Sequence, residues 1–204
     1  MKIAVIDYDA GNLRNVQKAF EHCGYPTFTT NRVGDIEDAN VLILPGVGSF
    51  SDGMSALERL KLDGVIANEV REKGKPILGI CLGMELLALD GNEGGKRLGL
   101  GLLPMSIQRL SSDVHGLRVP HMGWDNVDVV ASSIMFSGIP NDPDFFFAHS
   151  YHAVSEDNSI VVATCKYGHH FVAAVERDNI FATQFHPEKS QSIGLAILKN
   201  FNKL

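Results

Sequence analysis

The sequence predicts an α/β protein with a doubly wound, mostly parallel central sheet flanked by helices. Two observations support this prediction. Apolar segments with the length of strands alternate with helical segments as far as about residue 90, and glycine-rich turns directly follow two of the apolar segments. Such alternation is typical of parallel sheets, whose ligand sites lie beyond the carboxyl ends of the strands. We therefore expect the functional residues in the turns that follow the strands.

The first half of the chain contains the alternating segments. Leu13, Val16 and Phe20 form one apolar stripe at helical spacing, and Asn12 precedes them where a helix N-cap belongs. We expect a strand at residues 2–7, a helix at 13–23, a short strand at 25–29, a strand at 41–44, a helical stretch at 55–73 with a break near 63–64, a strand at 76–78 and a helix at 84–89.

The pattern changes after residue 90. Residues 90–101 are rich in glycine and charge, which is typical of a surface loop. We expect short strands at 106–110, 117–119, 145–147, 160–164, 171–175 and 180–182, and a final helix at 193–201. No proline- or serine-rich linker separates the two halves, so we expect residues 1–204 to form a single domain.

The composition is ordinary for a globular protein, with 204 residues, of which 45% are hydrophobic and 21% charged. The net charge of -6 argues against a protein that binds nucleic acid or anionic membranes. No apolar stretch has the length of a membrane span, and the N-terminus lacks a signal-peptide pattern. The 3 cysteines fit neither a disulfide framework nor a zinc site, and the histidines lack ligand spacing. We expect a reducing, cytoplasmic compartment and no metal.

A cysteine lies between two glycines at a predicted strand-to-helix turn. The stretch Gly79-Ile80-Cys81-Leu82-Gly83 has the pattern of a nucleophile elbow, with Cys where hydrolases often carry Ser. At a helix N-terminus the dipole and the free N–H groups favour the thiolate, and the N–H of Leu82 is placed to bind an oxyanion. The competing interpretation is a small buried cysteine without a chemical role.

Two further turns complete the pattern. The loop Pro45-Gly46-Val47-Gly48-Ser49-Phe50 follows an apolar strand but matches neither a P-loop nor a dinucleotide fingerprint, so it is either a plain turn or a second oxyanion donor. His186-Pro187-Glu188 follows the strand at 180–182, and Pro187 restricts the turn that carries both side chains. Glu188 would bind one imidazole nitrogen while the other faces the cysteine sulfur. A solvated polar turn is the alternative.

These motifs resemble those of the class I (triad) glutamine amidotransferases. Residues 8–13, 120–125, 147–152 and 184–190 are further similar to the glutaminase subunits of imidazole glycerol phosphate synthase, and the resemblance covers nearly the whole chain. It implies a flavodoxin-like fold. It also implies hydrolysis of glutamine to glutamate and ammonia through a cysteine thioester, without a cofactor.

The resemblance implies a role for each matching residue. Cys81 would be the nucleophile, His186 the proton carrier and Glu188 the group that orients the imidazole. Leu82 and the loop at Val47 and Gly48 would supply oxyanion donors, and a rearrangement of that loop would activate the enzyme. The substrate-binding positions would be Glu85, Glu93, His149, Ser150 and Tyr151, and the positions at or near a partner would be Asn12, Trp124 and Lys189.

Two positions depart from the family's pattern. Glu85 stands where the family typically carries Gln, and a carboxylate there would repel the carboxylate of the substrate unless Glu85 is protonated or turned away. We expect weaker glutamine binding or a compensating cation. His152 stands where Tyr is common, and it would either line the interface or tune the site.

The implied partner is a cyclase of (β/α)₈ barrel form, held in a heterodimer. It would use the ammonia to make imidazole glycerol phosphate and aminoimidazole carboxamide ribotide in histidine biosynthesis. Three alternatives stay open: a paralogous subunit that supplies ammonia to a surface-sugar synthase, a non-catalytic regulatory module, and another triad glutaminase such as those of guanine nucleotide or pyridoxal phosphate synthesis.

Overall fold

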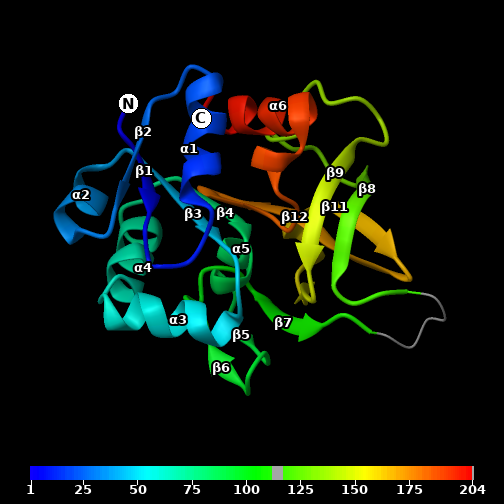
Figure 1. The fold of residues 1–204 in the computed structure, drawn as a ribbon, viewed down its shortest axis with the longest axis horizontal. Coiled ribbons are helices and arrows are strands. Elements are labelled where there is room, and N and C mark those ends of the chain that lie inside the picture. Colours follow the sequence, from blue (N-terminus) through cyan, green and yellow to red (C-terminus); the bar gives the residue numbers. More distant parts are fainter. Residues whose placement is uncertain (112–116, 204) are drawn as a thin grey trace.

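A nine-stranded mixed sheet forms the centre of the molecule in the computed structural model, which describes residues 1–111 and 117–203 (Figure 1). The strand order is β2-β1-β3-β4-β13-β12-β11-β8-β9, and a second sheet has the order β10-β7-β5-β6. The strands are β1 (Ile3–Ile6), β2 (Thr27–Thr30), β3 (Val41–Gly46), β4 (Ile77–Cys81), β5 (Asp90–Gly91), β6 (Arg97–Leu98), β7 (Met105–Arg109), β8 (His121–Val129), β9 (Asp144–His149), β10 (Tyr151–Ser155), β11 (Val161–Tyr167), β12 (His169–Arg177) and β13 (Ile180–Thr183).

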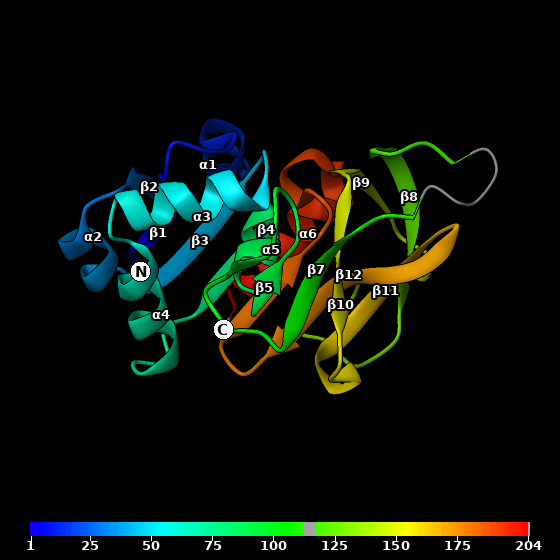
Figure 2. The same ribbon diagram turned by 90° about the horizontal axis from the view of Figure 1, so that it is seen from below.

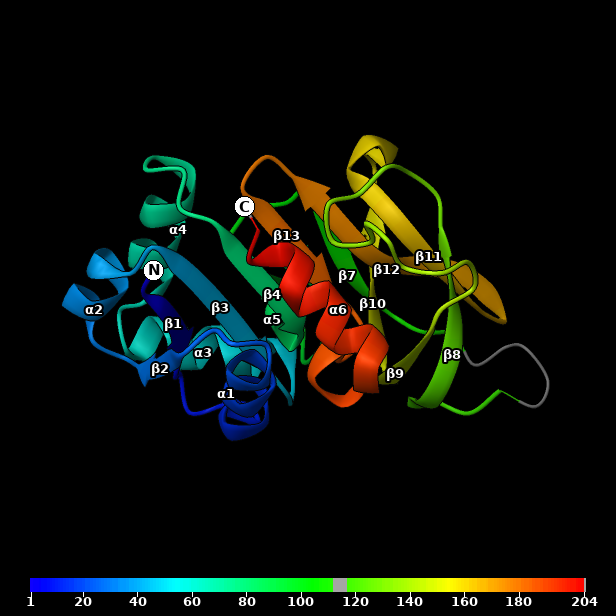
Figure 3. The same ribbon diagram turned by 90° about the horizontal axis from the view of Figure 1, so that it is seen from above.

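Helices cover both faces of the parallel part of this sheet. They are α1 (Leu13–His22), α2 (Val33–Asp38), α3 (Phe50–Arg59), α4 (Asp63–Arg71), α5 (Leu82–Leu86) and α6 (Gln191–Phe201), with short 3₁₀ turns η1 (Asn158–Ile160) and η2 (Pro187–Lys189). Figure 2 shows α3 and α5 in front of the strands, and Figure 3, from the opposite side, shows α1 and α6 there. The predicted α/β class is therefore confirmed.

Alternation along the strands explains the two helical layers. In β1, Ala4 and Ile6 pack into the apolar cluster with α3, α4 and α5, whereas Ile3 and Val5 pack into the cluster with α1 and α6. Because successive side chains of a strand point to opposite faces, an unbroken apolar strand needs cover on both sides. Each fully buried Val, Leu, Ile or Phe side chain in these clusters stabilises the fold by about 1.5–3 kcal/mol.

The sheet has a parallel and an antiparallel part. Strands β2, β1, β3, β4 and β13 run parallel to their neighbours. From β13 onward, β12, β11, β8 and β9 join in antiparallel pairs. The chain then passes from β9 through Ser150 into β10, which pairs with β7 in the second sheet. This crossing brings the turn between β9 and β10 next to the end of β4, where the carbonyl oxygen of Ala148 accepts a hydrogen bond from the Cys81 thiol.

Several elements differ from the sequence-based expectations. The helical stretch expected at 55–73 is interrupted, as expected, and the break lies at 60–62. Its first helix begins earlier than expected, at Phe50, because the Ser49 side chain accepts a hydrogen bond from the N–H of Asp52. Residues 117–119 form no strand, since pairing with β9 begins at His121. The sequence did not predict α2, β8 or β10, nor the short strands β5 and β6 within the stretch at 90–101 that was expected to be a surface loop. Within residues 1–111 and 117–203, no helix combines the length and apolar character needed to cross a membrane.

Candidate active site

Three parallel strands end side by side and bring three turns together. Gly46 at the end of β3 lies opposite Cys81 at the end of β4, and Thr183 at the end of β13 lies opposite Ile80. The loop after Gly46, the turn at Cys81 and the segment after Thr183 therefore share one edge of the sheet. These are the turns in which the sequence predicted the functional residues.

Cys81 has a backbone conformation that is uncommon for a residue with a side chain. Its φ is 53° and its ψ is -110°, and α5 starts at the next residue. Such a conformation costs on the order of 1–3 kcal/mol, and the surrounding structure must enforce it. The flanking glycines allow the turn: a Cβ at Gly83 would overlap the carbonyl oxygen of Leu44, and a Cβ at Gly79 would lie 2.9 Å from the carbonyl carbon of Gly83. The pattern of a nucleophile elbow is thus present in three dimensions.

The surroundings of Cys81 favour the protonated thiol over the thiolate. Burial raises its pKa well above the ordinary range, and the Glu85 and Glu188 carboxyl groups raise it further, against the N–H of Leu82 and the Lys189 ammonium, which lower it. The Sγ atom donates to the carbonyl oxygen of Ala148 at 3.9 Å. Burial and the two acids thus oppose the thiolate that the sequence pattern favours, because the loss of hydration acts against the N-terminal end of a helix of only 5 residues.

His186 and Glu188 form a buried pair on the turn after β13. The Nδ1 atom of His186 lies 2.8 Å from Oε1 of Glu188, and side-chain exposure is 3% and 2%. With Nδ1 as the donor, Nε2 is the unprotonated nitrogen that can accept a proton. Among the described residues, Nε2 has no hydrogen-bond partner. The hydrogen bond between the thiol and the imidazole is thus not formed here, as is common for catalytic groups without substrate.

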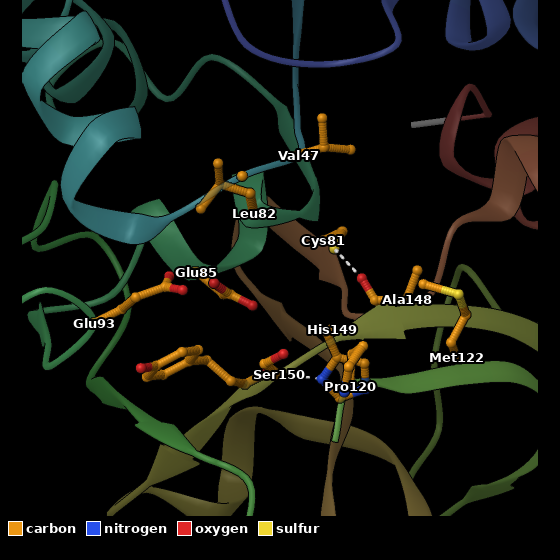
Figure 4. Close-up of a pocket in the computed structure, with 12 residues that line it drawn as sticks. Val47, Cys81, Leu82, Glu85, Glu93, Pro120, Met122, Ala148, His149 and Ser150 are labelled. Atoms are coloured by element: carbon orange, nitrogen blue, oxygen red, sulfur yellow. Dashed lines mark hydrogen bonds between the residues drawn. The ribbon is translucent and has the colours of Figure 1, made fainter. Parts of the chain in front are cut away.

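A pocket of about 220 Å³ opens beside Cys81 (Figure 4). All the residues that the sequence assigned to oxyanion stabilisation or substrate binding line it. The full lining is Val47, Gly48, Cys81, Leu82, Glu85, Glu93, Pro120, Met122, Ala148, His149, Ser150 and Tyr151. The sequence reasoning missed Ala148, whose contribution is a backbone oxygen, and it gave no role to Pro120 and Met122, although both lie in the 120–125 stretch that carried the resemblance.

Two carboxyl groups enter this pocket from different elements. An oxygen of Glu93, in the loop between β5 and β6, accepts the N–H of Phe50 at 2.7 Å. Glu85, on α5, is 4% exposed and accepts a hydrogen bond of 2.9 Å from the side-chain amide of Gln184. Burial raises the pKa of Glu85 to about 8, and Glu93 contributes to the rise. Gln184 was not predicted as a site residue, although a polar residue directly after an apolar strand was the available signal.

The far wall of the pocket is the turn between β9 and β10. The ring of His149 is held between two partners: Nδ1 donates to the carbonyl oxygen of Tyr151 at 2.7 Å, and Nε2 lies 3.0 Å from Nδ1 of His121. Burial lowers the pKa of His149 to about 3, so the ring is neutral. His149 therefore fixes the course of the turn, in which Ala148 and Ser150 also line the pocket.

The residues predicted at a partner face lie near one another. Trp124 is 46% exposed and packs edge-on against the ring of Phe146. The Lys189 ammonium lies 5.6 Å from the centre of the same ring. Asn12 is exposed and caps α1, which packs against the turn that carries Lys189.

His152 does not share that face or the pocket lining. It is buried in β10, with its ring 5.2 Å from that of His169. Because the side chain is buried, the structure favours the second of its two expected roles, tuning the site, over lining the interface. In the part of the chain that the structure describes, no group of three or more His, Cys, Asp or Glu side chains is placed to hold a metal ion.

Comparisons with known proteins agree with this arrangement. The family model "Glutamine amidotransferase class-I" matches residues 4–204. Proteins named imidazole glycerol phosphate synthase subunit HisH are similar over their length: that of Moorella thermoacetica is 47% identical, covering 99% of this chain and 94% of the relative. That of Aquifex aeolicus is 44% identical, covering 100% and 97%.

Solved structures share the fold. The PurLQS structure from Thermotoga maritima matches with a TM-score of 0.76 at 22% identity, covering 99% of this chain and 97% of that one. The glutaminase domain of Trypanosoma brucei CTPS with bound acivicin matches with a TM-score of 0.67 at 18% identity, covering 100% and 94%. From its sequence matches and its fold, the chain belongs to the class I glutamine amidotransferase family, among the HisH subunits of imidazole glycerol phosphate synthase.

Proposed function

We propose that this chain is the glutaminase subunit of an imidazole glycerol phosphate synthase. It hydrolyses glutamine to glutamate and ammonia and passes the ammonia to a cyclase subunit. The observation that carries the proposal is the pocket in which Cys81 meets the loop at Val47 and Gly48, with the His186–Glu188 pair at the same edge of the sheet. The names of the full-length relatives support the pairing with a cyclase.

The reaction uses the Cys81 thiol and the His186–Glu188 pair. The Cys81 thiol gives its proton to Nε2 of His186 while the sulfur attacks the side-chain amide carbon of glutamine. The imidazolium then protonates the departing nitrogen, so that ammonia leaves and a glutamyl thioester remains. Water then attacks the thioester and gives a proton to His186, and the imidazolium returns this proton to the leaving sulfur, which releases glutamate and restores the thiol. Glu188 keeps Nδ1 protonated throughout and stabilises the imidazolium.

The tetrahedral intermediates carry a negative oxygen that needs donors. The N–H of Leu82 lies close enough to the Cys81 sulfur to lower the thiol pKa, so it faces the reacting atoms. The second donor comes from the loop after β3. Val47 is exposed there, and Gly48 has φ +111° with open space around its α carbon, so core packing does not fix the loop. A rotation of this loop brings the donor into place and couples the site to a partner.

Two walls of the pocket bind glutamine: the loop that carries Glu93 and the turn between β9 and β10. Glu93 neutralises the substrate ammonium from the loop between β5 and β6. The turn of His149, Ser150 and Tyr151 contacts the substrate mainly through its backbone, since the His149 ring is occupied by partners within the protein. The surface around Trp124, Lys189 and Asn12 receives the cyclase, because an exposed Trp beside a cation provides a large anchoring area.

The raised thiol pKa and the unpartnered imidazole nitrogen favour a glutaminase that is slow until its partner binds. The holoenzyme is then a heterodimer that acts in the cytoplasm. Its cyclase makes imidazole glycerol phosphate and aminoimidazole carboxamide ribotide in histidine biosynthesis.

Glutamate release from glutamine tests the proposal. We would assay the purified chain alone, then with the cyclase barrel and its nucleotide ligand, with Cys81→Ala as control. We expect strong stimulation by the cyclase in the native chain and none in the variant. Glutaminase activity that does not change when the cyclase is added would reject the pairing with this cyclase. The chain would then be a glutaminase for another synthase. Absence of glutamate release in every condition would overturn the glutaminase function.

A further inference from the structure

Glu85 is an unusual acid for the site in which it lies. Its carboxyl group is 4% exposed, yet it lines the pocket beside the candidate nucleophile. Figure 4 shows the Glu85 and Glu93 carboxyl groups next to each other at one side of the pocket. Two acids at this spot face one substrate ammonium, so one of them has no opposite charge to meet.

The surroundings of Glu85 favour the neutral acid. The groups that face it are the Cys81 thiol from β4, the Tyr8 hydroxyl from the loop after β1, Glu93 from the loop between β5 and β6, and the Gln184 amide after β13. None of these groups is a cation. A buried carboxylate with a single amide donor and a second acid nearby is more costly than the protonated group.

We propose that Glu85 binds glutamine as a neutral carboxylic acid that donates a hydrogen bond to the substrate carboxylate, so that ionisation of this residue closes the pocket to glutamine. The inference rests on the proposed function. The ammonium and the α-carboxylate of glutamine are attached to the same carbon. With Glu93 at the ammonium, the adjacent Glu85 would therefore meet the α-carboxylate, where only a protonated acid is attractive. The raised pKa of about 8 agrees with this state at neutral pH.

The first test is the KM for glutamine, measured with the cyclase present between about pH 6 and about pH 9. Glu85→Gln keeps a donor at every pH, whereas Glu85→Met is neutral but donates nothing. We expect the ratio of the native KM to the Glu85→Gln KM to rise about tenfold between about pH 7 and about pH 9. The kcat ratio stays flat, and Glu85→Met has a high KM throughout.

The second test needs no catalysis. Since folding raises the pKa of Glu85, its stabilising contribution is complete below the ordinary pKa of about 4.3 and is lost as the pH rises towards about 8. The free energy of unfolding of the native chain minus that of Glu85→Gln therefore falls across this range, with the slope of one proton, and is constant above it. Other groups titrate in both proteins and cancel in the difference.

The two tests separate the possible failures. A difference in unfolding free energy that stays flat across the range would overturn the inference, whether or not glutamine is hydrolysed. A KM ratio that does not change with pH, in active enzymes, would do the same. If no variant releases glutamate even with the cyclase, the proposed function fails, and with it the role of Glu85 toward glutamine.

Discussion

The parallel and antiparallel parts of the sheet contribute to the candidate site in different ways. The ends of β3, β4 and β13 supply side chains and turns with a fixed chemical identity: Cys81, the pair His186 and Glu188, and the loop after Gly46. The turn between β9 and β10 supplies a wall, in which Ala148 offers a carbonyl oxygen. We therefore expect the chemistry to depend on residue type where the parallel strands end, and on the path of the backbone in the antiparallel part.

The largest effect on activity is expected where the parallel strands end, from the substitution Glu188→Gln. An amide in place of the carboxylate no longer enforces the Nδ1–H tautomer, so His186 loses its unprotonated Nε2. We expect kcat to fall by about 10²–10⁴-fold with little change in KM. Steady-state kinetics with the cyclase would measure both. A kcat within a few-fold of the native value would show that the pair has no role in the chemistry.

The second effect concerns stability in the same part of the molecule, where α5 packs against the end of β3. In Gly83→Ala the new methyl group overlaps the carbonyl oxygen of Leu44, so α5 must move away from β3. We expect the free energy of unfolding to fall by about 3 kcal/mol or more in urea denaturation. The matched control is Gly64→Ala in α4, where the methyl meets open space. It should gain about 0.5–1 kcal/mol, and equal losses in both variants would contradict the account.

The smallest effect is expected in the antiparallel part. Ser150→Ala removes a hydroxyl from the pocket wall but leaves the backbone path unchanged. We expect kcat/KM to change by no more than about twofold, equivalent to about 0.5 kcal/mol. A tenfold loss would show that this wall also works through side-chain identity, and would remove the distinction between the two parts.

The same distinction explains what the sequence could predict. The strands that lead to Cys81 and Gly46 are unbroken apolar runs because helices cover both of their faces, and the motifs at their ends are short and local. In β8, by contrast, most side chains are exposed or half-buried, so the apolar pattern that marks a strand is weak. The strand was therefore missed, and with it the course of the chain on that side of the molecule.

Charge states depended on the packed structure. The turn at Cys81 indicated a thiolate, whereas burial and two nearby acids favour the protonated form. The substitution at position 85 was visible in the sequence, whereas its partner Gln184 is 99 residues away along the chain. The absence of a hydrogen bond between His186 and Cys81 could not be predicted from a local sequence pattern either. Such properties arise from contacts between distant segments.

The most direct test of the account is covalent labelling with a glutamine-shaped electrophile, followed by peptide mapping. The chain has free cysteines at Cys23, Cys81 and Cys165, so the label can report which thiol the pocket presents to glutamine. The account predicts an adduct on Cys81 alone, which excess glutamine prevents and which Glu188→Gln slows. Labelling of Cys23 or Cys165, or labelling of Cys81 that glutamine does not compete with, would contradict the claim that this pocket delivers glutamine to Cys81.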